Sequence, residues 1–175
     1  MPDERTVYQS RVFDVHEQTV TAPDGKQFTH AWLRHPGSVG IVPILGQGAD
    51  ARVLLITQTR QPIGQRLWEL PAGTREPGEE PQATAEREIQ EETNYTAGRM
   101  EKLSEFYLAP GYSDELMHLF LATDLRPAEG QQDEDEDIEV VAMPLAEAVA
   151  RARRGEWNDV KTVAGLLLAA ARLGL

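Results

Sequence analysis

The sequence contains no cysteine among its 175 residues. Disulfide bonds and cysteine-ligated zinc sites are therefore excluded, and this composition suits a reducing compartment, so we expect a cytoplasmic protein. The first ten residues, MPDERTVYQS, carry charges where a signal peptide needs an apolar segment. The longest apolar stretch, near residues 163–171, is too short to span a bilayer.

Basic residues are also scarce, with 17 Lys and Arg against 29 Asp and Glu, which gives a formal net charge of −12. A field of this sign repels nucleic acid and anionic membranes, so we expect neither as a partner. A phosphate-bearing small molecule would need bound cations to approach such a protein.

The length and an apolar share of 41% fit one globular domain over residues 1–175, and no repeat or long linker divides it. Alternating segments around Asp24-Gly25 predict an antiparallel hairpin within residues 1–36, ahead of a core over residues 37–175. Apolar runs predict strands over residues 37–45, 51–60, 103–110, 116–125 and 138–144. Residues 61–81 are predicted to be mostly loop, with LWEL as a possible short strand. Helices are predicted over residues 81–93, 145–154 and 158–173. The fold class is α/β (α+β), with helices packed on a mixed sheet.

The helix over residues 81–93 concentrates negative charge on one face. Glu88 and Glu92 are four residues apart and Glu91 is three from Glu88, so the carboxylates share a narrow stripe, while Ile89 faces the opposite way. Like charges at this spacing destabilise a helix unless a cation lies between them, and Mg²⁺ prefers oxygen ligands of this kind. The alternative is a solvated surface helix in which Arg87 pairs with Glu91.

These residues extend into a longer pattern that resembles the Nudix hydrolase family. The spacing of the family signature is kept by Gly73, Glu79, Arg87, Glu88, Ile89, Glu91 and Glu92. Asn94 replaces the family glycine after the helix, and Tyr95 replaces an aliphatic residue. We expect Asn94 to cap the helix in the left-handed conformation, because Asn tolerates that conformation better than other non-glycine residues.

The resemblance implies a Nudix-like α/β/α sandwich and a metal-dependent hydrolase. Glu88, Glu91 and Glu92 would bind Mg²⁺ or Mn²⁺, together with the backbone carbonyl of Ala72. Arg87 and Glu79 would orient these carboxylates, with Gly73 in a neighbouring loop. In the reaction, water attacks one phosphorus of a nucleoside diphosphate linked to another group.

Pro110 lies fifteen residues after Tyr95, in the sequence YLAPGYSDE. Family members that hydrolyse ADP-ribose have a proline near this place, so the resemblance favours ADP-ribose, cleaved to AMP and ribose 5-phosphate. Tyr112 and Glu115 flank the presumed substrate loop. Pro-Gly is also a common turn between strands, and the pattern does not exclude GDP-mannose or other nucleotide sugars.

Candidates for the catalytic base lie in the acidic run over residues 133–137, because similar enzymes carry a water-activating Glu just before the last strand. Glu134 is the first choice and Glu136 the second, while Glu91 is the alternative on the signature helix. The run also suits an ordinary solvated loop. Arg60 is predicted to contact a phosphate or the adenine, with a plain surface arginine as the alternative.

The resemblance also implies a homodimer in which the N-terminal hairpin crosses to the partner and covers its nucleotide pocket. Trp32 and Phe28 would then contact the base, although aromatic residues in strands are more often core. Two other functions stay open: a broader nucleoside diphosphate sugar hydrolase, and a catalytically silent nucleotide-binding module.

Overall fold

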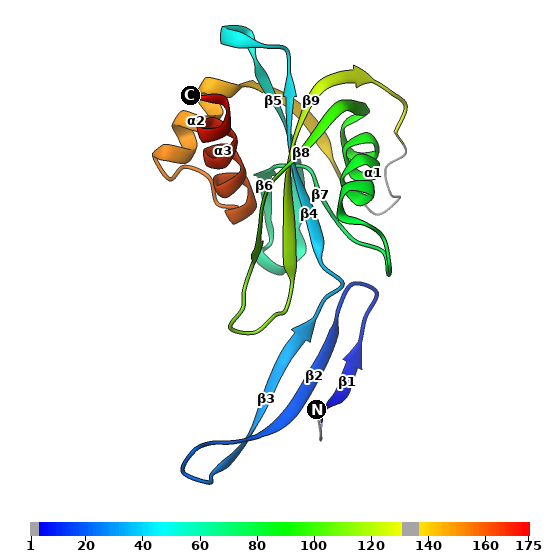
Figure 1. The fold of residues 1–175 in the computed structure, drawn as a ribbon, viewed down its shortest axis with the longest axis vertical. Helices are drawn as coiled ribbons and strands as arrows, with labels where there is room; N and C mark the ends of the chain where they lie inside the picture. The colour runs from blue at the N-terminus through cyan, green and yellow to red at the C-terminus, as the bar shows by residue number, and fades with distance from the viewer. Residues whose placement is uncertain (1–3, 131–136) are drawn as a thin grey trace.

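The structure is a computed structural model that describes residues 4–130 and 137–175. A large sheet lies between helices, and a smaller N-terminal sheet extends away from one end of it (Figure 1). The smaller sheet contains β1 (Arg5–Gln9), β2 (Asp14–Thr21) and β3 (Gln27–Arg34). The larger sheet contains β4 (Ser38–Leu45), β5 (Arg52–Arg60), β6 (Gln65–Glu69), β7 (Ala72–Thr74), β8 (Tyr95–Tyr107), β9 (Leu116–Pro127) and β10 (Glu139–Pro144). The helices are α1 (Pro81–Thr93), α2 (Leu145–Arg153) and α3 (Val160–Leu173), with the 3₁₀ turns η1 (Gly48–Asp50) and η2 (Gln61–Ile63).

The larger sheet is mixed, as the sequence predicts. Its strand order is β10-β5-β4-β9-β8, with β6 beside β5 and β7 beside β4. The β4–β9 pair is parallel and the other pairs are antiparallel.

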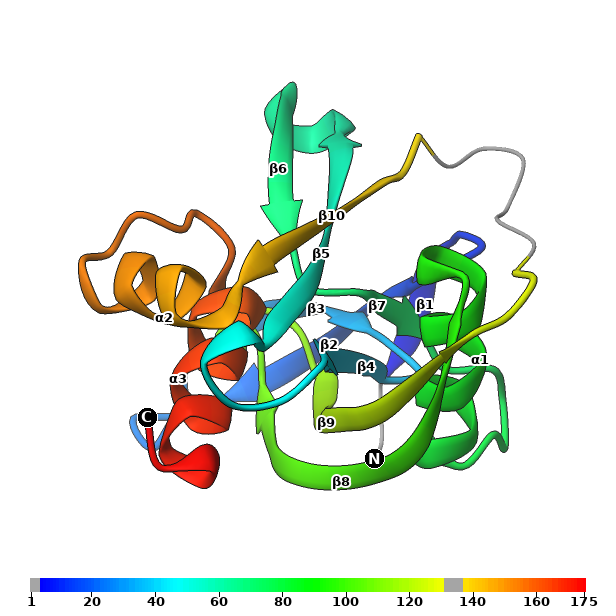
Figure 2. The same cartoon turned by 90° about the horizontal axis from the view of Figure 1, so that it is seen from above.

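Helices cover both faces of this sheet, which confirms the α/β/α sandwich (Figure 2). On one face, Ala85 and Ile89 of α1 pack against Val39 and Ile41 of β4. On the other face, α2 and α3 pack against a larger apolar cluster that includes Val42 of β4. Alternate β4 residues therefore serve opposite cores, as the two-residue period of a strand requires.

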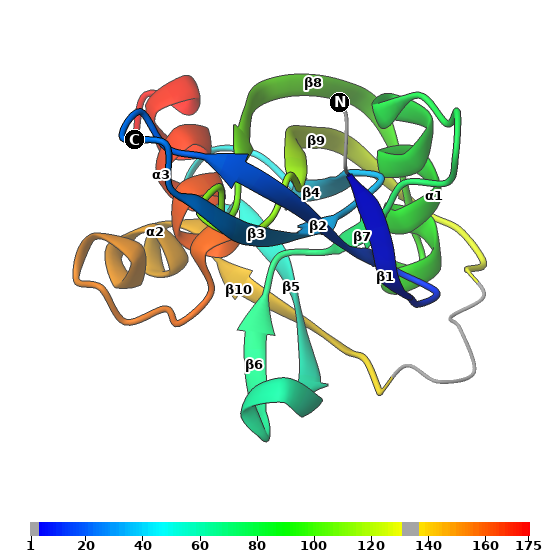
Figure 3. The same cartoon turned by 90° about the horizontal axis from the view of Figure 1, so that it is seen from below.

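The N-terminal segment forms three strands rather than the expected hairpin. The turn at Asp24-Gly25 is as predicted: Gly25 has φ +84°, and the Lys26 backbone N–H donates to Oδ1 of Asp24 at 3.1 Å. The added strand β1 pairs with β2, so β2 lies between β1 and β3 (Figure 3). Every residue of β1 is exposed. Two- and three-stranded sheets with little buried surface are marginally stable alone.

Two other boundaries differ from the sequence prediction. β8 begins at Tyr95, eight residues before the expected start at residue 103, because its first half pairs with the far end of β9. Residues 61–81 hold β6 and also β7, which was expected to be loop. Both differences come from pairing with strands distant in sequence, which local patterns do not report.

Helix α3 begins at Val160, two residues after the expected start, and the Asp159 carboxylate caps it by accepting the Thr162 backbone N–H at 3.0 Å. None of the helices in the described part of the chain has the length and apolar character needed to cross a membrane.

Helix α1 ends at Asn94 in the left-handed conformation, with φ 60° and ψ 34°, which confirms the predicted cap. Its backbone N–H donates to the Gln90 carbonyl at 3.0 Å. The side chain has a second role, since its Oδ1 accepts the Gly130 backbone N–H at 2.9 Å. Asn94 therefore joins α1 to the segment that follows β9.

We expect Asn94→Ala to lower the free energy of unfolding by about 1–2 kcal/mol, because alanine is strained in this conformation and loses the bond to Gly130. Asn94→Gly relieves the strain but also loses the bond, so the two effects largely offset and its stability should stay within about 1 kcal/mol of the wild type. Urea denaturation measures both variants. An Asn94→Ala protein as stable as Asn94→Gly would contradict this account of the cap.

Candidate active site

A cavity of about 870 Å³ lies between the N-terminal sheet and the α1 side of the sandwich. Small-molecule sites typically occupy roughly 300–1,000 Å³, so this cavity can hold a large metabolite. Both acidic and basic side chains line it, including Arg60, Arg87, Glu88 and Glu91.

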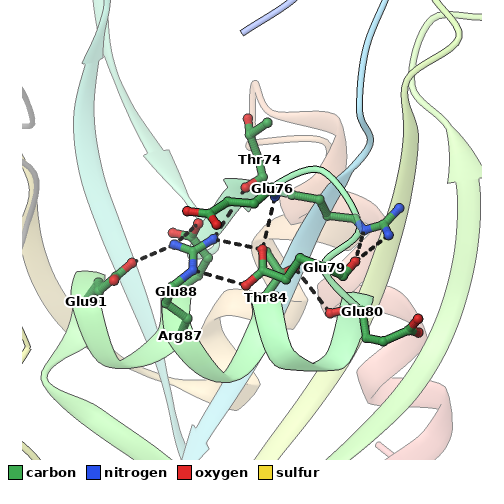
Figure 4. A network of polar contacts seen from close by, with 9 residues as sticks. Thr74, Glu76, Glu79, Glu80, Thr84, Arg87, Glu88 and Glu91 are labelled. Carbon is green, nitrogen blue, oxygen red and sulfur yellow. Dashed lines mark hydrogen bonds and ion pairs between the residues drawn. The ribbon is translucent and has the colours of Figure 1, made fainter. Parts of the chain in front are cut away.

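Arg87 is the centre of the polar network on the exposed face of α1 (Figure 4). Its Nη1 lies 2.8 Å from Oε1 of Glu88 and 2.8 Å from Oε2 of Glu91. Its Nε donates to Oε1 of Glu79 at 3.3 Å, and its Nη2 donates to the Thr74 carbonyl at 3.4 Å. One guanidinium thus compensates three carboxylates, which removes much of the repulsion expected from the sequence.

Glu79 precedes α1 and faces Arg87. Burial of the carboxylate opposes its ionisation and is the largest single influence, but hydrogen bonds from Arg87 and from the Glu76 backbone N–H outweigh it. Together they lower the pKa of Glu79 to about 2. Glu79 is therefore a permanent anion near neutral pH and fixes the guanidinium from the side opposite Glu91.

Glu88 is packed against Gly73. Gly73 lies in β7, paired with Val39 of β4, and not in the expected loop. A Cβ atom added to Gly73 would lie 1.9 Å from Oε1 of Glu88. Glycine is needed here for space, not for an unusual backbone conformation, because only a residue without a side chain admits the carboxylate.

Glu92 is almost fully buried, with 2% of its surface exposed. Its Oε2 accepts the backbone N–H of Ala72 at 2.9 Å. Among residues 4–130 and 137–175, no three acidic or histidine side chains are grouped as a metal centre. In this arrangement Glu88 and Glu91 form ion pairs with Arg87, while Glu92 accepts a hydrogen bond from the β7 backbone, so all three carboxylates already have partners.

Arg60 reaches the same cavity from the last position of β5. Its Nε and Nη2 donate to the two carboxylate oxygens of Glu69, both at 2.7 Å. The hydrogen bonds that Arg60 donates to Glu69 raise the pKa of Arg60 above its ordinary value and outweigh burial, which opposes protonation. The side chain is held in place, unlike an ordinary surface arginine.

The other predicted substrate residues are not among the described residues that line this cavity. Trp32 lies on the N-terminal sheet, with its ring centroid 5.9 Å from that of His16, and Phe28 is 50% exposed. Tyr112 is 62% exposed, and Oε1 of Glu115 accepts a hydrogen bond from the Ser38 hydroxyl at 2.7 Å. Pro110 lies beside Tyr112 in an exposed turn.

The turn that contains Pro110 instead attaches the sandwich to the N-terminal sheet. The Leu33 backbone N–H donates to the Tyr112 carbonyl at 2.8 Å, and the Asp114 backbone N–H donates to the Leu33 carbonyl at 3.1 Å. Asp114 also accepts the His35 backbone N–H at 2.8 Å. Glu134 and Glu136, predicted as bases, lie outside the described residues.

Several cavity residues were missed in the sequence: Phe13, Arg34, His35, Gln58 and Arg75. They come from the segment between β1 and β2, the end of β3 and the residue after it, the end of β5, and the segment between β7 and α1. No spacing rule connects these segments, because only the folded chain brings them to one cavity. Arg75 alone had a usable signal, since it follows the LPAG sequence that leads into the acidic helix.

The fold and this carboxylate helix define a known class of protein. The NUDIX domain model matches residues 34–165, more than half of the chain, and the chain belongs to the Nudix hydrolase family. It is 37% identical to an ADP-ribose pyrophosphatase of Bacillus subtilis, covering 89% of this chain and 84% of the relative. It is 33% identical to a GDP-mannose pyrophosphatase of Escherichia coli, covering 90% and 87%. A crystal structure of an ADP compounds hydrolase superposes with a TM-score of 0.83 at 26% identity, over 99% of this chain and 92% of that one.

We expect Gly73→Ala to lower the free energy of unfolding by about 1–3 kcal/mol, because the new methyl group must displace the Glu88 carboxylate from a packed position. Thermal or urea unfolding measures the loss. Gly111→Ala is the matched control, since a Cβ there meets no atom within 4 Å. Equal stability of the two variants would show that Gly73 does not give Glu88 its space.

Proposed function

We propose that this protein hydrolyses the pyrophosphate bond of ADP-ribose to AMP and ribose 5-phosphate, with Mg²⁺ or Mn²⁺ as its cofactor. The observation that carries the proposal is that Glu88 and Glu91 share one cavity with the fixed cations Arg60 and Arg87. Such a cavity suits a diphosphate whose charge is balanced from two sides. The similarity of the chain to an ADP-ribose pyrophosphatase and to an ADP compounds hydrolase supports ADP-ribose as the substrate.

The residues present fit a divalent cation. Glu88, Glu91 and Glu92, with the Ala72 carbonyl, would hold it, and hard oxygen donors are what Mg²⁺ and Mn²⁺ prefer. The Glu88 and Glu91 oxygens already converge on one positive atom, Nη1 of Arg87, at 2.8 Å each. When bound, the metal would neutralise phosphate charge and lower the pKa of a coordinated water.

The chain's own side chains would prepare the reaction. Glu79 orients Arg87, and Arg87 orients Glu88 and Glu91. Arg60, which lines the same cavity, would contact a phosphate. The oxygen of water forms a bond to one phosphorus, the bond from that phosphorus to the bridging oxygen breaks, and a base takes the proton of the water. Glu91 lines the cavity and is a candidate base, and Glu134 and Glu136 stay predictions.

A broader nucleoside diphosphate sugar hydrolase is the second candidate, supported by the GDP-mannose pyrophosphatase relative. Pro110, Tyr112, Glu115, Trp32 and Phe28 stay predicted substrate contacts. Because they do not line the cavity of the single chain, such contacts would be made in a dimer. The cytoplasmic location also stays a prediction.

The substrate proposal is tested by turnover with Mg²⁺ or Mn²⁺ over a panel of ADP-ribose, GDP-mannose and other nucleotide sugars. We expect ADP-ribose to have the highest kcat/KM. We expect Glu92→Gln to lower kcat by about 100-fold or more, since it removes a charged ligand of the metal. Glu86→Gln, on the exposed side of the same helix, is the matched control and should keep wild-type kcat.

Each failure has its own meaning. Preferential cleavage of another nucleotide sugar would reject ADP-ribose as the substrate. Wild-type kcat in Glu92→Gln would reject the metal role of this helix. Absence of turnover over the whole panel would leave a nucleotide-binding module as the better description.

We further propose a homodimer that pairs through the N-terminal sheet. In support, β1 is exposed throughout, and Val7, Tyr8 and Phe28 present large apolar side chains to solvent. We expect sedimentation velocity to give twice the chain mass of 19.5 kDa. Tyr8→Lys should shift the protein toward monomer, while Lys26→Glu in the distant turn should not. A wild-type monomer at micromolar concentration would refute the dimer.

A further inference from the structure

A buried ionic cluster lies behind Arg60, where β5 and β6 meet the start of α3. Glu69 is 1% exposed and Lys161 is 6% exposed, and the Lys161 ammonium forms an ion pair with Oε2 of Glu69. Nζ of Lys161 also lies 3.1 Å from Oδ2 of Asp159. With the two bonds from Arg60 to Glu69, the cluster joins two acids and two bases and is neutral as a whole.

Stability alone does not explain this cluster. Removing several charges from water costs about as much as their mutual attraction returns, and apolar replacements of buried ion pairs are often neutral or stabilising. Burial opposes ionisation of Glu69, yet the contacts with Arg60 and Lys161 lower its pKa overall. What the cluster does fix is geometry, because a charged carboxylate accepting two parallel bonds determines the plane of a guanidinium.

The same cluster is tied to the strand beside the metal carboxylates. The Leu70 backbone N–H donates to the Thr162 hydroxyl at 2.8 Å. A Cβ added to Gly165 of α3 would lie only 2.4 Å from Leu70, so the helix and this segment are in close contact. Two residues later, the Ala72 backbone N–H holds Glu92. The start of α3 therefore fixes both Arg60 and the chain segment that leads to the carboxylates.

Arg60 keeps part of its binding capacity for a ligand. Its Nε and Nη2 are used by Glu69, and in the part of the chain that the structure describes Nη1 has no hydrogen-bond acceptor. The side chain is 40% exposed and lines the cavity. A free long side chain would lose rotamer entropy on binding a phosphate, whereas a side chain already held loses less.

We propose that Glu69 and Lys161 are positioning residues that hold Arg60 at the cavity wall, so that its remaining N–H groups meet the diphosphate of the substrate. The inference rests on the proposed function and deepens it, because it assigns the binding of one phosphate to Arg60, which Glu69 and Lys161 of α3 hold in place. Lys161 acts only through Glu69. Without Lys161, the buried carboxylate of Glu69 would lose part of the positive charge that compensates it.

The test replaces the buried pair by apolar residues in Glu69→Met/Lys161→Met and combines this change with Arg60→Gln. We expect the paired change to raise KM for ADP-ribose about 10-fold, with kcat within about 2-fold of the wild type, because a charge-assisted contact to phosphate is lost. In the Arg60→Gln background the paired change should have no further effect on KM. Thermal unfolding should show that the apolar pair keeps the fold.

The matched control is Lys102→Met/Glu105→Met, which removes an exposed ion pair at 2.6 Å and should leave KM unchanged. Glu69→Gln is the milder second variant should the apolar pair not fold, and it should also raise KM. An unchanged KM in the variants that alter Glu69, or KM effects that multiply with that of Arg60→Gln, would overturn the proposal.

If the wild type cleaves only another nucleotide sugar, the substrate claim fails, and the same set of variants is compared with that sugar. If the wild type cleaves none of the sugars, calorimetry measures the dissociation constant of ADP-ribose for the same variants.

Discussion

The arrangement of this site depends on one guanidinium that compensates several carboxylates. Arg87 contacts Glu79, Glu88 and Glu91, and this permits α1 to carry like charges at neighbouring positions in a chain of net charge −12. A helix with these charges uncompensated would be destabilised and would keep its carboxylates apart. With Arg87 in place, oxygens of Glu88 and Glu91 are held close together on one face, where the proposed divalent cation would find oxygen ligands.

The sheet supplies the second requirement, which is close approach. Gly73 admits the Glu88 carboxylate against β7, and the Ala72 backbone N–H holds Glu92 beside it. Behind this strand, the cluster around Glu69 connects α3 to Arg60. Ion pairs therefore hold both Arg60 and Arg87 in place at the cavity. Prearranged charge of this kind stabilises a reacting diphosphate without reorganisation of the protein.

The N-terminal sheet stands outside both apolar cores and is attached mainly through the turn at residues 109–115. The sequence-based expectation made this turn a substrate loop. In the single chain it holds Leu33 and His35 instead, which sets how the N-terminal sheet faces the cavity. The turn thus influences the site by placing the residues of another segment there, among them Phe13 and Arg34.

The sequence by itself determined the boundaries of α1, its cap at Asn94 and the order of the helices and of most core strands, because these depend on local periodicity and backbone preference. It also placed Glu88, Glu91, Glu92 and Arg87 on one helix. Tertiary structure alone decided the early start of β8, the strand conformation at Gly73, the residues that the N-terminal sheet brings to the cavity and the buried partnership of Arg60 with Glu69 and Lys161. These depend on contacts between segments far apart in sequence, and their geometry is set by strand pairing and by the packing of α3, which no local pattern encodes.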